Sequence, residues 1–159
     1  TTTQNIVIGG AAGAIPPLVG FAAVAGSLDL AAWLLFAIVF FWTPAHFWAL
    51  AILIKDDYAR AGIPMLPVVR GEVAATWGIL WYALSLVPLS ILLFVIGAAG
   101  PLYLGAALSL GTVFVAFAVR LVRGAELRRR ALARGLYLYS LLYLALLFAA
   151  ICVDSAVRL

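Results

Sequence analysis

The sequence has few charged residues: only 10% are Asp, Glu, Lys or Arg, whereas 67% of its 159 residues are hydrophobic. A water-soluble domain of this length carries roughly 25% charged residues. This shortage excludes an ordinary soluble domain and predicts an integral membrane protein whose outer surface faces lipid. The net charge of +4 and the pI near 9.6 then indicate membrane topology and contact with anionic headgroups, and we expect no nucleic-acid partner.

Cysteine is almost absent, since Cys152 is the single one in the chain. An intrachain disulfide and a paired-cysteine metal site are therefore excluded. The chain starts with "TTTQNIVIGG", which contains no initiator methionine and no basic segment followed by a cleavage site. Because this start runs directly into a hydrophobic segment, we expect the sequence to be a piece of a longer protein.

Long hydrophobic runs, in contrast, are abundant. A helix crosses a bilayer with about 20 mostly apolar residues, because backbone amides need internal partners where no water reaches. Five segments meet this requirement, and no window shows the alternation of a strand. The predicted fold is an all-α, polytopic transmembrane helix bundle in one domain, with spans at residues 5–24, 30–54, 74–96, 102–122 and 136–157.

The basic residues indicate how the spans are oriented. The two longer polar connections, residues 55–73 and 123–135, must lie on the same side because the chain changes sides at each span. Nine of the ten Lys and Arg residues lie in or beside them, and only Arg158 lies opposite. Positive residues stay on the cytoplasmic side, so we expect both loops to be cytoplasmic, in a bacterial inner (plasma) membrane rather than a mitochondrial inner membrane.

Glycine and aromatic residues predict how the helices pack. Gly9 and Gly13 form a small-xxx-small pair that would let another helix approach closely. Two groups of aromatic residues lie near the expected cytoplasmic ends of the third and fifth spans. We interpret both groups as interface belts rather than as ligand cages; they are Trp77, Trp81 and Tyr82, and Tyr137, Tyr139 and Tyr143.

His46 is the only histidine, and it lies well inside the second predicted span. An ionisable group at that depth usually faces a cavity or a partner. Two interpretations stay open: a role in ligand binding, or a neutral histidine bonded to a carbonyl that Pro44 frees. In an unbroken helix, His46 and Asp57 would share one face, about 16 Å apart along the axis.

Asp56 and Asp57 are the only adjacent carboxylates, and they follow the same span. Carboxylate oxygens suit Mg²⁺, which typically keeps several waters and bridges to substrate phosphates. Lys55, Arg60 and Arg70 would then supply positive charge to a diphosphate. The alternative is that these acids and bases form ordinary solvated pairs at a helix end.

Three blocks of the sequence resemble a known family. In order, "TTTQNIVIGGAAGAIPPLVGF", "FWTPAHFWALAI" and "KDDYARAGIPMLPVVRG" are similar to the protoheme IX farnesyltransferases, a branch of the UbiA superfamily of intramembrane prenyltransferases. The second and third blocks are highly specific, whereas the glycine-rich first block is weak alone. The resemblance extends through the remaining helices and covers the C-terminal part of the family fold.

The resemblance implies a bundle of about nine transmembrane helices around a cavity open to the membrane and the cytoplasm. It implies transfer of a farnesyl group from farnesyl diphosphate to a vinyl group of haem B, with Mg²⁺ as cofactor and haem O and diphosphate as products. It also implies that Asp56 and Asp57 hold the metal, that Lys55 and Arg60 bind diphosphate, and that His46 and Trp42 contact haem.

Two departures from the family pattern bear on these roles. The acids of the motif are adjacent here, whereas family members space them about four residues apart, so which aspartate acts stays open. The first aspartate-rich motif of the family does not occur in the chain, and the N-terminal helices that carry it would be partners of this one. We therefore expect the isolated chain to be inactive.

Two non-catalytic interpretations of the chain also stay open. The chain could be a membrane transporter or a haem- or cofactor-handling subunit that uses the cavity at His46. It could also be a purely structural bundle whose charges only set topology. Mg²⁺-dependent release of diphosphate from farnesyl diphosphate by the full-length protein would separate the enzyme from both.

Overall fold

The computed structural model describes residues 2–158, and these form eight helices and no strand. Five helical segments are long and apolar enough to cross a bilayer, which confirms the predicted all-α membrane bundle. The elements are α1 (Asn5–Gly13), α2 (Ile15–Ala25), α3 (Leu30–Leu53), α4 (Lys55–Arg60), α5 (Leu66–Val69), α6 (Gly71–Val95), α7 (Pro101–Arg123) and α8 (Glu126–Arg158).

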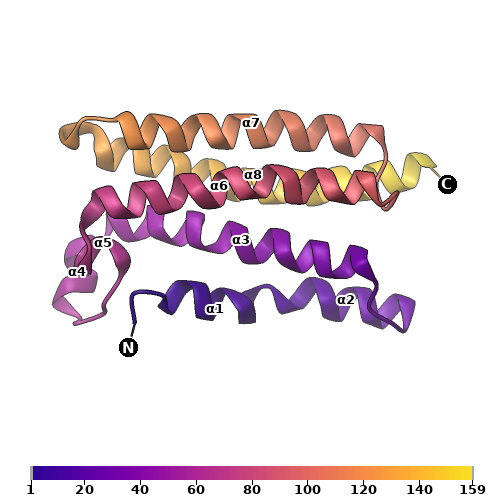
Figure 1. Cartoon of the computed structure of the whole chain (residues 1–159), viewed down its shortest axis with the longest axis horizontal. Helices are drawn as coiled ribbons and strands as arrows, with labels where there is room; N and C mark the ends of the chain where they lie inside the picture. Colours follow the sequence, from indigo (N-terminus) through magenta and orange to yellow (C-terminus); the bar gives the residue numbers. More distant parts are fainter. Residues whose placement is uncertain (1, 159) are drawn as a thin grey trace.

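The long helices lie side by side, with α3 at the centre of the bundle (Figure 1). Helix α3 packs against α6 and α8 on one side and against α1 and α2 on the other, and α7 packs against α6 and α8. Within residues 2–158, α1 and α2 contact no long helix other than α3. The helix pair α1–α2 therefore forms a separate layer that packs on α3, and the Asn5 side chain also donates to the Met65 sulfur at 3.4 Å.

Helix α3 is the most buried of the five spans, because neighbours cover two of its sides. It begins where the Asp29 side chain accepts a hydrogen bond from the Ala32 N–H at 3.0 Å, which satisfies one of the free donors of the first turn. The helix continues through Pro44 and ends at Leu53. Its central residues form the core with α6 and α8, including Ile38, Ala45, Ala49 and Ile52.

The first span differs from the prediction in its packing. Two helices make it up, because Pro16 and Pro17 start a new helix after the break at Ala14. The close approach to α3 occurs at Gly10, where an added Cβ would lie 3.0 Å from Cγ2 of Thr43. At Gly9 and Gly13 an added Cβ would meet nothing within 4 Å. The predicted glycine pair thus lines an open face, and its neighbour Gly10 makes the contact.

The last connection also differs from the prediction. Residues 126–135, which we expected to belong to a loop, form the first turns of α8, and only Gly124 and Ala125 separate α7 from α8. Helix α8 has 33 residues, or about 50 Å at 1.5 Å per residue, compared with about 30 Å for the hydrocarbon core. Part of α8 must therefore extend beyond the hydrocarbon, at the end that carries α4.

Candidate functional site

Helix α4 holds the two adjacent aspartates. The chain leaves the α3 axis at Ile54, whose φ of −111° and ψ of 32° interrupt the regular helix. The Ile54 carbonyl then accepts hydrogen bonds from the N–H groups of Asp57 and Tyr58 at 3.1 and 3.2 Å, which start the short helix α4. Because α3 and α4 are separate helices, the unbroken-helix geometry that related His46 to Asp57 does not apply.

The two carboxylates of α4 are exposed and are both paired with arginines. Asp56 accepts a hydrogen bond from Arg130 of α8 at 2.8 Å, and Asp57 pairs with Arg60, one turn later in α4. The exposed fractions of the aspartate side chains are 73% and 61%. Ion pairs this exposed contribute at most about 1 kcal/mol, so a stronger cationic ligand can displace the arginines at little cost.

Glu72 carries a second pair of cations beside α4. Its two carboxylate oxygens lie 3.4 Å from Nζ of Lys55 and 3.3 Å from an Nη of Arg129. Glu72 and Arg129 are the better-buried members, with side chains 18% and 13% exposed. This cluster ties α4, α6 and α8 together. It also places Lys55, a predicted diphosphate residue, next to Asp56.

Three charged residues of this cluster were not singled out from the sequence as site residues. Arg129 and Arg130 counted only toward topology, because they fell within the expected loop of residues 123–135. Glu72 gave no motif at all. Arg70, in contrast, was predicted to bind diphosphate, but it is exposed and has no ion-pair partner among residues 2–158.

The donors for a metal are present but incomplete. Among the described residues, no group of three or more His, Cys, Asp and Glu side chains could hold a metal ion. Asp56 and Asp57 supply hard carboxylate oxygens at an exposed position, which is the donor type that Mg²⁺ prefers. The chain therefore fits Mg²⁺ by donor chemistry, with the rest of the coordination left to water, substrate oxygens or other residues.

His46 lies between the rings of two aromatic residues in the core. Its ring stacks on Trp42 of α3 at a centroid distance of 4.4 Å and on Tyr137 of α8 at 4.7 Å. Phe47 lies nearly perpendicular to the imidazole, with the ring centroids 5.1 Å apart, and His46 is only 5% exposed. Trp42 donates its Nε1–H to the Ser140 carbonyl at 2.8 Å, which fixes the ring that covers one face of the histidine.

The hydrogen bonds around His46 assign its tautomer. Nδ1 lies 2.7 Å from Oγ of Ser140, and the Ser140 hydroxyl donates to the Tyr137 carbonyl at 2.6 Å. Because a serine hydroxyl has one proton to donate, Nδ1 must carry the hydrogen and donate to Oγ. Nε2 then keeps its lone pair. The histidine thus bonds to a serine of α8 and not to a carbonyl that Pro44 frees.

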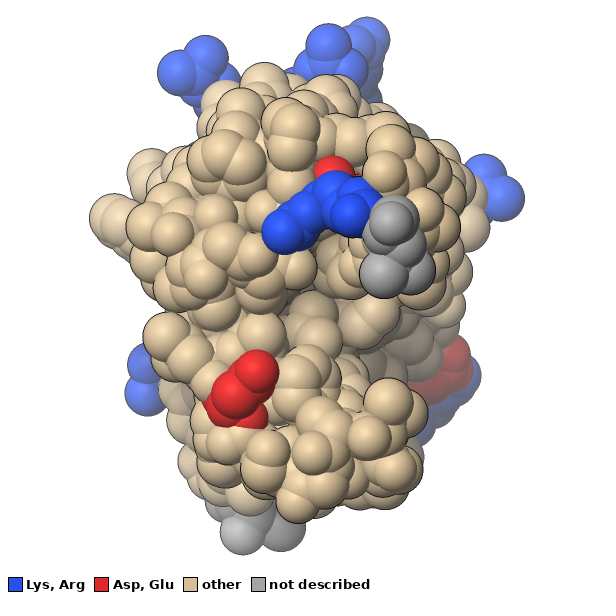
Figure 2. Space-filling model, turned by 90° about the vertical axis from the view of Figure 1, so that its right-hand side faces the viewer, with Lys and Arg blue, Asp and Glu red and all other residues tan. Residues whose placement is uncertain are grey.

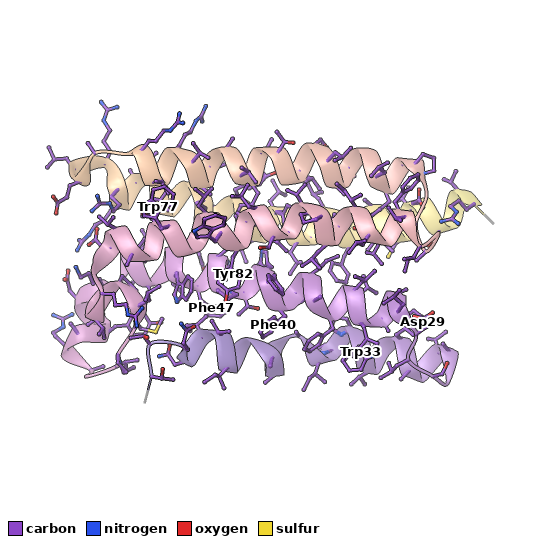
Figure 3. The ribbon with its side chains drawn as sticks, in the orientation of Figure 1. Asp29, Trp33, Phe40, Phe47, Trp77 and Tyr82 are labelled. Atoms are coloured by element: carbon purple, nitrogen blue, oxygen red, sulfur yellow. The ribbon has the colours of Figure 1, made fainter. Side chains whose placement is uncertain are left out.

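Two apolar hollows open beside Trp42. One of about 340 Å³ lies between α1 and α3, where Gly9, Gly13 and Phe47 line it. The other, of about 370 Å³, lies between α3 and α8, and Leu144 and Phe148 line it. Val39 and Trp42 line both hollows. Figure 3 shows Phe47 pointing from α3 toward α1, into the first of them.

The aromatic groups divide differently from the predicted belts. Trp77 and Trp81 of α6 are 49% and 65% exposed, as a belt requires, and Trp77 lies at the α4 end of the bundle (Figure 3). The tyrosines of α8 face inward instead. Tyr143 is fully buried, Tyr139 donates its hydroxyl to the Leu110 carbonyl at 2.8 Å, and Tyr137 stacks on His46.

A comparison with protein families decides the membership of the chain. The model of the UbiA prenyltransferase family matches residues 1–141. The chain belongs to the UbiA prenyltransferase family.

Three relatives of this UbiA family member carry the same name. The chain is 54% identical to a protoheme IX farnesyltransferase of Gloeobacter violaceus, and the alignment covers 98% of the chain and 50% of the relative. It is 56% identical to one of Thermus thermophilus over 98% of the chain and 25% of the relative. It is 55% identical to the one of Nostoc sp. PCC 7120 over 97% of the chain and 48% of the relative.

The chain spans half or less of the length of these relatives. No solved structure matches it.

Proposed function

We propose that this chain forms part of a protoheme IX farnesyltransferase, which transfers the farnesyl group of farnesyl diphosphate to a vinyl group of haem B. The products are haem O and diphosphate. The observation that carries the proposal is the identity of 54–56% along nearly the whole chain with relatives of that name. The family model supports the prenyltransferase class independently.

The diphosphate site of this proposal lies at α4. Asp56 and Asp57 would hold Mg²⁺, which when bound neutralises charge on the departing diphosphate. Lys55 and Arg60 would contact the diphosphate oxygens directly. Their ion pairs are exposed or partly exposed, so the side chains can turn toward an anion without losing much stability. We propose this end of the bundle as the cytoplasmic one, because nine of ten basic residues lie at it.

The farnesyl tail and the porphyrin would occupy the apolar region beside α3. Apolar walls with a few fixed polar groups are typical of sites for such ligands. The walls also keep bulk water from an allylic cation. His46 would face haem with the Nε2 lone pair, since Ser140 holds the hydrogen on Nδ1, and Trp42 would contact the porphyrin. Imidazole nitrogen is a common iron ligand.

The remainder of the relatives' length would complete the site. The open face of α1, with Gly9 and Gly13, is a surface on which further helices of the same protein would pack, and these helices would close the ligand hollows beside Trp42 from outside. A second set of carboxylates from those helices would complete the metal shell at α4. On this proposal the isolated chain is inactive, and the membrane is the bacterial inner membrane.

Replacing Asp57 tests the diphosphate site. In the full-length protein, Asp57→Asn removes a charged metal ligand, and we expect farnesyl transfer to haem B to fall at least about 100-fold, as for loss of a group that stabilises transition-state charge. Haem O formation is measured by chromatography, with membrane insertion checked in parallel. Glu126→Gln is the matched control, because Glu126 is exposed and lies on α8 at the same end. Near-normal turnover of Asp57→Asn would remove Asp57 from the site.

Replacing His46 tests the haem contact. His46→Ala removes Nε2, and we expect haem affinity to weaken about tenfold or more while the affinity for farnesyl diphosphate stays within about twofold. An absorption titration with haem B measures the first, and inhibition by a non-hydrolysable diphosphate analogue measures the second. Unchanged haem affinity and an unchanged haem spectrum would give His46 a structural role only.

A further inference from the structure

A basic hollow of about 420 Å³ lies at the turn between α7 and α8, apart from the site described above. Three arginines line it: Arg120 and Arg123 from the last turn of α7, and Arg128 from the first turn of α8. The side chains of Val119 and Leu132 form an apolar wall beside them. No acidic residue lines this hollow.

These arginines differ from the other cations at the same end of the bundle. Lys55, Arg60, Arg129 and Arg130 each pair with a carboxylate. Within residues 2–158, Arg120, Arg123 and Arg128 have no such partner. Glu126 is close in sequence, but it is exposed, lines no part of the hollow and makes no ion pair in the described chain. Three unneutralised guanidinium groups around one hollow repel one another, and an anion between them would remove that cost.

The α7 helix dipole explains part of this arrangement. Cations are favoured in the last turn of a helix, and this accounts for the sign of Arg120 and Arg123. It does not account for Arg128, which lies in the first turn of α8, where a cation is disfavoured. Arg128 is therefore the residue whose position calls for an anion.

The hollow lies where a bilayer presents phosphate groups. The α7–α8 turn is at the same end of the bundle as α4, on the side away from α1 and α2 (Figure 1), and nitrogen-tipped side chains stand out beyond α7 at that end (Figure 3). Leu127, next to Arg128, is 99% exposed. A fully exposed leucine beside arginines suits the boundary between headgroups and acyl chains, and it does not suit contact with water alone.

We propose that this hollow binds the phosphate of an anionic phospholipid in the leaflet that faces α4. Arg120, Arg123 and Arg128 would donate to the phosphodiester oxygens, and Arg is suited to this because its planar fork bonds two oxygens at once. Val119, Leu132 and Leu127 would contact the glycerol and upper acyl carbons. The apolar wall and the outward position favour a lipid over a free phosphate or diphosphate ion. The inference does not depend on the proposed farnesyl transfer.

Lipid titrations of the full-length protein in detergent test the proposal. Dioleoylphosphatidylglycerol, dioleoylphosphatidylcholine and inorganic diphosphate are titrated separately, and native mass spectrometry counts the bound molecules. We expect tight binding of the phosphatidylglycerol alone at this site. Arg123→Gln and Arg128→Gln should each weaken it about fivefold, which is the effect of one basic residue near an anionic lipid surface.

The matched control is Arg134→Gln. Arg134 is an exposed arginine of α8, does not line the hollow and has no acidic partner among residues 2–158, so phosphatidylglycerol binding should stay within about twofold. An equal loss in Arg134→Gln would show general surface attraction and overturn the proposal. Equal binding of phosphatidylcholine would also overturn the proposal. So would the result that Arg123→Gln and Arg128→Gln weaken the binding of inorganic diphosphate but not that of phosphatidylglycerol.

Discussion

Two of the buried polar contacts that connect α8 to its neighbours differ in one respect. Near the C-terminus of α8, Asp154 binds the start of α7; in the middle of α8, Ser140 binds His46 of α3. Both groups are almost completely buried, so both needed hydrogen-bond partners to be tolerated in the core. The two contacts differ in whether the helices of this chain supply a partner for every hydrogen-bonding position of the buried group.

The Asp154 contact is complete within the chain. Its carboxylate accepts from the N–H groups of Gly100 and Tyr103 at 2.5 and 3.1 Å, and Arg158 lies 3.6 Å away. Gly100 precedes α7 and has no side chain to cap it, so Asp154 supplies the cap from another helix. Figure 2, which views this end of the bundle, shows few charged side chains on it. Every oxygen has a partner, which indicates a structural role.

The His46 contact is incomplete within the chain. Ser140 uses Nδ1 of His46, and aromatic rings cover both faces of the imidazole, but Nε2 keeps a lone pair without a hydrogen-bond partner in the described residues. Two apolar hollows adjoin the neighbouring Trp42. The comparison teaches that burial alone does not separate the two contacts; they differ in whether the described residues satisfy every bonding position of the polar group.

The largest effect expected from this comparison is on stability, at Asp154. Asp154→Ala would leave the N–H groups of Gly100 and Tyr103 without acceptors in a buried position, and we expect the full-length protein to lose several degrees of melting temperature in detergent. Asp154→Asn, which keeps one acceptor oxygen, should lose less. Haem affinity of the folded fraction should not change. A haem defect with unchanged melting would contradict the structural role.

A smaller effect is expected at Ser140, and it concerns ligand binding. Ser140→Ala removes the acceptor for Nδ1 of His46 and should weaken haem binding about tenfold, as expected for loss of one buried hydrogen bond. The Trp42 bond goes to the Ser140 backbone carbonyl, so it survives the substitution. Ser140→Thr keeps the hydroxyl and is the control. If Ala and Thr bind haem equally, Ser140 does not orient the histidine.

The smallest effect is expected at Arg158. Its side chain is 45% exposed, and it also donates to the Gly97 carbonyl at 3.2 Å. Because exposed ion pairs contribute little, Arg158→Gln should shift the melting temperature much less than Asp154→Ala does. A loss as large as that of Asp154→Ala would mean that the ion pair, rather than the cap, holds α7 to α8.

The spans could be predicted from the sequence because hydropathy alone decides them. The start of α3 after Asp29 and the break at Ala14, just before Pro16 and Pro17, also follow from local chemistry. The end of the second span at residue 54 was predicted, because Lys55 and two aspartates follow the apolar run. The separate short helix α4 was not predicted, because the polar residues after Ile54 gave no sign of a second helix. The helical start of α8 was not predicted, because a run of arginines outside the apolar segment is typical of a polar loop. Glu126 and the arginines that follow it are nevertheless compatible with a helix outside the membrane.

The candidate site was predictable only as a set of residue types. The sequence pointed to His46, Asp56, Asp57 and Lys55, and the structure places Lys55 and both aspartates in one charged region of α4. The ion-pair partners of these residues depend on the tertiary structure, because they lie far apart in the sequence. Glu72, for example, is 17 residues from Lys55 and 57 residues from Arg129. Ser140 carried no signal of its own, because a serine in an apolar helix is common without function, and Tyr137 was assigned to an interface belt.

The length of α8 has a consequence for the whole site. A single uninterrupted helix carries Arg130 against Asp56, Ser140 against His46 and Asp154 against Gly100. One residue inserted between Arg130 and Ser140 would turn the two ends relative to each other by about 100° and separate them by a further 1.5 Å or so. The outer contact would then be lost while the inner ones persist, so the spacing along this helix sets how far the charged headgroup region stands from the buried imidazole.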